Sequence, residues 1–122
     1  MRFEAGSPNT LGQAALHASI GLLQDFGMEQ VEKNVTANSF ALSEGLMDIP
    51  GIELSMPFDR QRVSGIVSFR PPDGNPVRVQ QILKSRGLSC TVRANAIRLS
   101  PHFYQSGRPV QKMLDLIEES VK

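Results

Sequence analysis

A helical hydrophobic period near the start of the chain, resumed after a single glycine, constrains the fold more than any other feature. Residues 10–26 contain no proline, and small or apolar side chains recur there at helical spacing. These side chains belong to Leu11, Ala14, Ala15, Ala18 and Leu22. Gly27 supplies the left-handed conformation that commonly ends a helix, and the period resumes over 28–47 until Pro50 prevents continuation. The sequence therefore predicts consecutive helices over 10–26 and 28–47, the first with an alanine face that another helix can approach closely.

The hydrophobic period changes to two after residue 51, which is typical of strands. Residues 52–56 alternate apolar and polar side chains, and residues 63–69 are rich in β-branched and apolar types. We expect further short strands over 88–93 and 96–100, joined as a hairpin through Ala94-Asn95.

Helical signals return twice in the second half of the chain. Asn75 and Pro76 resemble an N-cap and a first helical position, which predicts a helix over 76–86. Behind Pro109 runs an apolar helical stripe made of Val110, Met113, Leu114, Ile117 and Val121. The predicted order is α-α-β-β-α-β-β-α. This order indicates one α+β domain over 1–122, with a small, mainly antiparallel four-stranded sheet and helices packed on one face.

Composition excludes several classes of protein. Apolar residues make up 40% and charged residues 20% of the 122 residues, a globular balance, and the net charge of +1 does not favour nucleic acid as a partner. No apolar stretch reaches the ~20 residues of a membrane span, so we expect no membrane partner. Cys90 is the single cysteine, which excludes an internal disulfide and favours a cytoplasmic location.

Motifs of self-contained catalysis are absent from the sequence. There is no phosphate-binding glycine motif, no zinc-hydrolase motif and no Cys/His cluster, so we expect no metal site. His17 lies alone within the first predicted helix, where a surface or packing role is the more common one. No spacing identifies a nucleophile with its base, and we therefore expect no catalytic residue in this chain.

Two segments resemble the class V aminotransferases, which are pyridoxal-phosphate (PLP) enzymes. Residues 2–9 read Arg2-Phe3-Glu4-Ala5-Gly6-Ser7-Pro8-Asn9 and resemble the family's R-F-E-x-G-T/S-P-N stretch. Residues 97–104 read Ile97-Arg98-Leu99-Ser100-Pro101-His102-Phe103-Tyr104 and resemble its late I-R-x-S-P-H-F-Y-N-T motif. Their order and separation also agree with the family. The resemblance thus covers essentially the whole chain and implies the C-terminal small domain of aspartate-aminotransferase-type PLP enzymes.

The resemblance also implies a missing part. In this family the cofactor pocket and the Schiff-base lysine lie in a large domain that precedes the R-F-E stretch. The lysines present here match no such motif; they are Lys33, Lys84, Lys112 and Lys122. We therefore expect a fragment that is inactive and binds no PLP alone. Its partners would be the missing large PLP domain, a homodimer mate and an amino-acid substrate.

Candidate binding residues lie within these motifs or close to the second one. Arg98 would hold the substrate carboxylate through a two-pronged contact, the alternative being an ordinary strand arginine. The loop Gly6-Ser7-Pro8-Asn9 would lie near the cofactor, or else form a tight turn with Asn9 as a helix N-cap. For Arg93 we favour a charge at the sheet edge over a second anion contact.

The late motif leaves its remaining residues with two interpretations. His102 and Tyr104 fit a binding role, yet a packed aromatic turn that anchors the last helix explains them equally well. Gln105-Ser106 replaces the family's Asn-Thr, and we expect Ser106 to cap the last helix.

The segment from Cys90 to Arg98 bears on which branch of the family the chain resembles. The lid that carries the persulfide cysteine of cysteine desulfurases is absent between Arg93 and Arg98, and Cys90 lies on a predicted strand, where it should be buried. The motif therefore favours the aminotransferase, kynureninase and epimerase branches. An alternative from another class is a free-standing α+β module that binds a small ligand or regulates.

Overall fold

The computed structural model describes residues 6–105 and 107–122, so the Arg2-Phe3-Glu4 stretch and the predicted cap Ser106 lie outside the described residues. The chain divides into two compact units, Met1–Val31 and Glu32–Lys122. Each unit is described by itself.

The first unit contains helix α1, Thr10–Phe26. Asn9 is its N-cap, and the Asn9 Oδ1 atom accepts a hydrogen bond from the backbone N–H of Gly12 at 2.9 Å. Gly27 ends the helix with a φ of 94°, and its N–H bonds to carbonyls of the last turn. Helix α2, Met28–Met47, begins directly afterwards. Both predicted helices are therefore confirmed, although no residue of α1 is buried.

The second unit contains a four-stranded antiparallel sheet in the order β1-β2-β4-β3, which confirms the predicted sheet. The strands are β1 (Glu53–Leu54), β2 (Val67–Arg70), β3 (Thr91–Arg93) and β4 (Ala96–Leu99). Each is shorter than predicted. Between β1 and β2 the chain forms a loop with the short 3-10 helix η1, Arg60–Arg62. Before β3, the Leu88 N–H bonds to the Leu83 carbonyl and closes the preceding helix instead of joining the sheet.

The predicted hairpin turn between β3 and β4 is confirmed. Ala94 and Asn95 both have positive φ, 47° and 57°, which is the conformation of the two central residues of a type I′ turn. Asparagine tolerates this region better than most residues, whereas alanine adopts it at some cost. The turn pairs Arg93 directly with Ala96.

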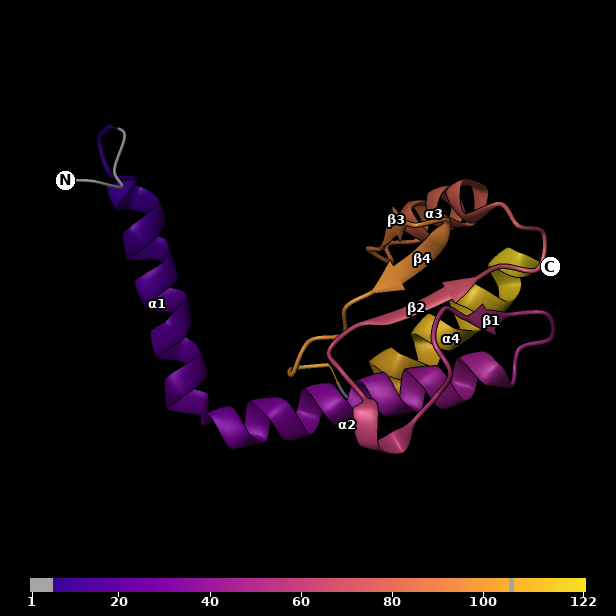
Figure 1. Cartoon of the computed structure of the whole chain (residues 1–122), viewed down its shortest axis with the longest axis horizontal. Coiled ribbons are helices and arrows are strands. Elements are labelled where there is room, and N and C mark those ends of the chain that lie inside the picture. The colour runs from indigo at the N-terminus through magenta and orange to yellow at the C-terminus, as the bar shows by residue number, and fades with distance from the viewer. Residues whose placement is uncertain (1–5, 106) are drawn as a thin grey trace. The chain divides into compact units, whose positions relative to one another are not determined.

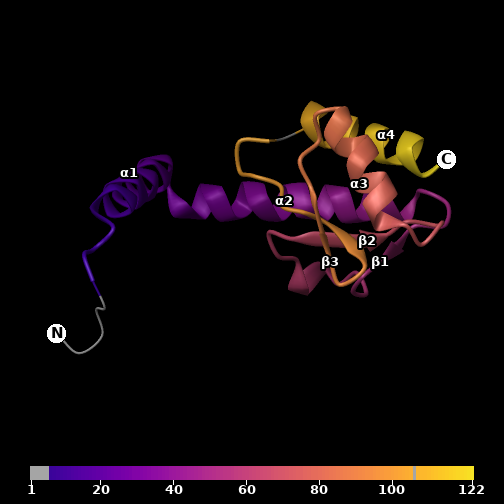
Figure 2. The ribbon, with the colours of Figure 1, turned by 90° about the horizontal axis from the view of Figure 1, so that it is seen from above.

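Helices α2, α3 (Pro76–Ser85) and α4 (Arg108–Val121) lie on one face of the sheet, as Figures 1 and 2 show together. Alternation along β2 and β4 directs Val67, Phe69, Ile97 and Leu99 toward these helices, and all four are buried. The helices contribute the remaining core side chains, among them Leu42, Leu46, Val79, Leu83, Val110, Met113 and Ile117. One core therefore fills the space between the helices and one face of the sheet.

A glycine allows α2 and α4 to approach closely. A Cβ atom added at Gly45 would collide with the side chain of Leu114 on α4. Every larger residue at this position would force Leu114 to move.

Within the described part of the chain, no helix is both long and apolar enough to cross a bilayer.

Candidate functional site

The face of the sheet opposite the helices carries a concentration of arginine. Residues paired directly across an antiparallel sheet share a face, so the register of the paired strands defines the members of this face. They are Glu53, Ser68, Arg70, Thr91, Arg93, Ala96 and Arg98. We call this set the arginine face. Because it carries three arginine side chains and a single carboxylate, it attracts anions.

Arg98 occupies the centre of the arginine face. It lies on β4 with Ser68 of β2 on one side and Thr91 of β3 on the other. The residue is half-buried, and its Nε atom is buried without a hydrogen-bond partner among the described residues. An unpaired buried donor costs about 1–3 kcal/mol, more when it belongs to a charged group, so this guanidinium favours an acceptor from elsewhere. A carboxylate that binds the planar guanidinium through two oxygens would supply it.

Arg93 lies on the edge strand β3 and is exposed, as the prediction of a sheet-edge charge requires. It is two residues beyond Thr91, the direct partner of Arg98, and therefore is a diagonal neighbour of Arg98 at about 7–8 Å in ordinary strand geometry. A contact between Arg93 and an anion stays a prediction.

Two asparagines of α2 hold the turn that follows β4. The Nδ2 atom of Asn38 donates to the His102 carbonyl at 3.0 Å and also to the Gln105 carbonyl. One helical turn earlier, the Nδ2 atom of Asn34 donates to the Phe103 carbonyl at 3.1 Å. We call this pair the asparagine clamp. It fixes the backbone immediately after the strand that carries Arg98.

Sequence reasoning missed the asparagine clamp. Asn38 is only 4% exposed, and an amide at a buried helix position is a recognisable signal, because such a group must be hydrogen-bonded. Its acceptors, however, lie more than sixty residues away along the chain.

The aromatic turn is packed on itself. The rings of His102 and Tyr104 stack with their centroids 4.2 Å apart, while Phe103 between them is buried. The His102 N–H donates to the Gln105 Oε1 atom at 2.7 Å. These contacts match the packed-turn interpretation; a binding role for His102 and Tyr104 stays a prediction. Helix α4 then begins after Gly107, whose N-cap position has no side-chain hydrogen bond.

The loop Gly6-Ser7-Pro8-Asn9 is exposed, and its asparagine caps α1 as described above. This contact matches the structural interpretation of the loop. Its proximity to a cofactor stays a prediction.

Cys90 is 5% exposed, which confirms the predicted burial. Burial raises the pKa of its thiol above the ordinary value, and the charge of Lys84 offsets this only in part. A buried neutral thiol is a poor nucleophile.

A lysine that holds a PLP aldehyde must direct its amine into a cavity. Lys33, Lys84 and Lys112 are exposed on helices, and Lys122 pairs with Glu118 at 2.9 Å. None of these lysines lines the cavity that residues of the loop between β1 and β2 form. The residues of this chain therefore do not fit a Schiff-base site. Nor does the described part of the chain group enough His, Cys, Asp or Glu side chains to hold a metal ion.

The model of the aminotransferase class-V family matches residues 1–102 of this sequence. The chain therefore belongs to the aminotransferase class-V family, as its two motifs predicted. A "probable cysteine desulfurase" of Pyrococcus abyssi is 30% identical over 99% of this chain and 33% of its own length. A protein of the same name from Halalkalibacterium halodurans is 29% identical over 94% of this chain and 25% of its own length.

Solved structures of related enzymes contain the same fold as this chain. The apo cysteine desulfurase of Thermococcus onnurineus superimposes with a TM-score of 0.87 at 27% identity, over 98% of this chain and 33% of that enzyme. The cystine C-S lyase C-DES, solved with its product cysteine persulfide, shares the fold with a TM-score of 0.81 at 24% identity, over 97% of this chain and 32% of its own. A C-DES mutant carries glycine covalently linked to its PLP cofactor. The chain spans between a quarter and a third of the length of these relatives.

The branch of this chain within the family stays a prediction. The absent lid favours aminotransferases, kynureninases and epimerases, whereas several relatives are named cysteine desulfurases and one, from Bacillus subtilis, is named an uncharacterized aminotransferase.

Proposed function

We propose that this chain is the substrate-carboxylate-binding part of a larger PLP-dependent class V enzyme that acts on an amino acid. The observation that carries the proposal is the half-buried Arg98 guanidinium, whose Nε atom has no acceptor among the described residues, at the centre of the arginine face. Arg98 would bind the α-carboxylate with both branches of its fork.

Neighbouring residues would support this contact. Arg93 adds positive charge on the same face, which would steer an anionic group toward Arg98. The asparagine clamp holds the turn after β4 and thereby keeps the end of that strand in place.

PLP and its lysine would belong to a part of the enzyme outside this chain, because the lysines present do not fit that role. The exposed apolar side chains of α1, among them Leu11 and Leu22, would be covered by the large domain or by a homodimer mate. The loop Gly6-Ser7-Pro8-Asn9 would then approach the cofactor. This arrangement also accounts for a chain that spans one third of its relatives.

We do not assign a persulfide step to this chain. A cysteine that receives sulfur must expose its thiolate, and Cys90 is buried with a raised pKa. The proposed reaction class therefore remains PLP chemistry on an amino acid, without a named side chain for the substrate.

A chimaera tests the proposal. This chain replaces the equivalent third of the Thermococcus onnurineus cysteine desulfurase, and the change in PLP absorbance on adding amino acids gives their Kd. Arg98→Ala should weaken binding by about 2–4 kcal/mol, roughly 30-fold to 1,000-fold, because a charge-assisted contact is lost. Arg98→Lys should retain more affinity than Arg98→Ala but less than the natural arginine, because a lysine cannot bind a carboxylate with a planar fork.

The matched control is Arg70→Ala, which removes a guanidinium from the same face next to Glu53. It should change the Kd by less than about threefold, as expected for an exposed charge. An unchanged Kd in Arg98→Ala, with normal PLP absorbance, would refute the role of Arg98.

A further inference from the structure

The loop between β1 and β2 encloses a cavity that the proposed function does not use. The backbone N–H of Ser55 bonds to the Ser68 carbonyl at 2.8 Å, which brings the ends of the loop together. Residues 54–59, 62–64 and 66–68 line a cavity of about 530 Å³, to which Ser43 of α2 also contributes. Closed surface loops of this kind are frequently functional, and the volume is within the usual range for small-molecule sites.

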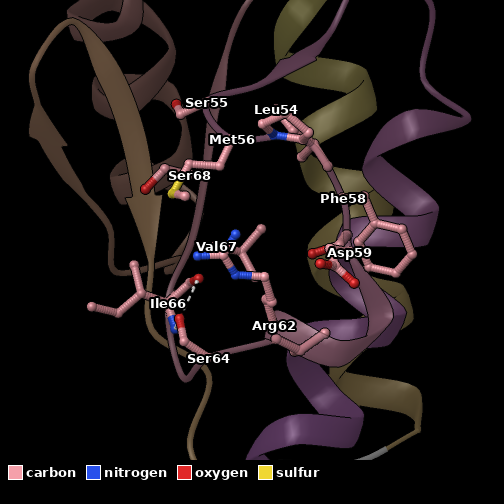
Figure 3. A pocket seen from close by; sticks show the side chains of 13 residues that line it. Leu54, Ser55, Met56, Phe58, Asp59, Arg62, Ser64, Ile66, Val67 and Ser68 are labelled. Atoms are coloured by element: carbon pink, nitrogen blue, oxygen red, sulfur yellow. Dashed lines mark hydrogen bonds between the residues drawn. The ribbon is translucent and has the colours of Figure 1, made fainter.

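The cavity carries one cation and one anion. Figure 3 shows the Arg62 guanidinium extending across the loop toward Ile66 and Val67, with the Asp59 carboxylate on the other side. No ion pair joins Arg62 to Asp59, or to any other residue that the structure describes. Asp59 uses its Oδ1 atom to accept from the Gln61 N–H at 2.9 Å, which leaves acceptor capacity on the carboxylate.

Arg60, on the same short helix, differs from Arg62 because its guanidinium has partners. Its Nη2 atom pairs with Glu44 Oε1 at 3.1 Å, and its guanidinium lies 4.9 Å from the centre of the Phe40 ring. Arg60 is thus engaged on the outside of the loop. Arg62 retains donors that a ligand can use.

The rest of the lining is largely apolar. Leu54, Met56, Phe58 and Ile66 contribute hydrocarbon surface, and Met56 and Ile66 are among the most exposed large apolar side chains of the second unit. A ligand that fills the cavity would remove this surface from water, which is favourable.

We propose that this cavity binds a free α-amino acid with an apolar side chain. The carboxylate would accept from Arg62, the ammonium group would donate to Asp59, and the side chain would lie against Leu54, Met56 and Ile66. A zwitterion fits better than a simple anion, because the two charged side chains of the lining have opposite signs. The site is separate from the arginine face: neither Arg93 nor Arg98 lines it, although Ser68 borders both.

The test uses this chain without PLP and compares three ligands of similar shape. L-leucine carries both charged groups, 4-methylpentanoate lacks the ammonium group, and isopentylamine lacks the carboxylate. Titration calorimetry gives each Kd, and amide chemical shifts locate the site. Leucine should bind roughly tenfold or more tighter than either analogue and should shift resonances of residues 54–68.

The variants separate the two contacts. Arg62→Ala should weaken leucine roughly 10-fold to 100-fold and bring its Kd to that of isopentylamine. Asp59→Asn removes the charge but keeps a side chain that caps η1 equally well, and it should bring leucine to the Kd of 4-methylpentanoate. The matched control Arg60→Ala should leave all three Kd values unchanged.

Several results would overturn the proposal. One is that leucine, methionine and phenylalanine show no saturable binding. Another is that leucine and its two analogues have equal Kd values. A third is that Arg98→Ala removes leucine binding while Arg62→Ala does not. The last result would place the amino acid on the arginine face and would favour the proposed function instead. Thermal unfolding confirms that each variant is folded, and Arg62→Gln replaces Arg62→Ala if the alanine variant is not.

Discussion

Helices α1 and α4 show opposite outcomes of the same sequence signal. Both were predicted from apolar residues at helical spacing, and both are present. In α4 the stripe is buried at Val110, Met113 and Ile117. In α1 nothing is buried, and Leu11 and Leu22 are 82% and 65% exposed.

The distribution of apolar residues around each helix determines how many packing neighbours the helix needs to cover them. Charged side chains occupy the remaining faces of α4, so one neighbour is enough to cover its stripe. In α1, Leu16 and Ile20 lie on a different side from Leu11 and Leu22 and are also exposed. A helix that is apolar on several sides needs more than one neighbour. The periodicity therefore predicts the helix, whereas burial depends on what packs against it.

The largest expected effect comes from removing one apolar side chain from each helix. Ile117→Ala should lower the free energy of unfolding by about 2–5 kcal/mol, because Ile117 is completely buried and leaves a cavity. Its counterpart Leu22→Ala should change it by less than about 0.5 kcal/mol. Urea unfolding of both variants measures the contrast. Similar losses in the two variants would show that α1 is packed in solution.

A smaller effect is expected from adding a methyl group to a helical glycine. Gly45→Ala would collide with Leu114, whereas an added Cβ at Gly21 of α1 has no neighbouring atom within 4 Å. Both changes gain the same helix propensity, so their difference isolates the collision. Gly45→Ala should be about 1–3 kcal/mol less stable than Gly21→Ala by urea unfolding. Adding Leu114→Ala to Gly45→Ala should remove most of the collision; if it does not, the close approach of α2 and α4 is not the cause.

Sequence patterns predicted the helices almost residue by residue because helix signals are local: Asn9, Gly27 and Pro76 act within one turn of their own positions. Strand lengths were overestimated because pairing requires a partner. β1 contributes only two paired residues, so residues 63–66 have no partner there and remain a loop.

The candidate sites likewise divide into those that local sequence predicts and those that depend on contacts between distant residues. Arg98 was predicted from a motif and Arg93 as a charge at the sheet edge, and strand alternation puts them on one face. The asparagine clamp and the Arg62 cavity were missed, because they depend on side chains that meet across the fold or around a closed loop.

The smallest expected effect concerns the buried thiol. Because the folded-state pKa of Cys90 is raised above its ordinary value of 9.0, folding favours the protonated thiol. The stability that it contributes is complete below that pH and is lost as the pH rises through the folded-state pKa. Cys90→Ala should cost about 1 kcal/mol at pH 7 through lost packing, and the difference from the natural chain should shrink above pH 9.0. Urea midpoints on both sides of that pH measure this, with slow alkylation of the native thiol as a second readout. Rapid alkylation would contradict the burial.

The two-residue turn at Ala94-Asn95 has a consequence for the charge pattern of the sheet. Because side chains alternate between the faces of a strand, a single residue added to this turn without a bulge would shift β3 by one position. Arg93 would then face the core, and Val92 would be exposed in its place. The length of one short connection, rather than the identity of any residue in it, therefore determines whether the two neighbouring guanidinium groups share a surface.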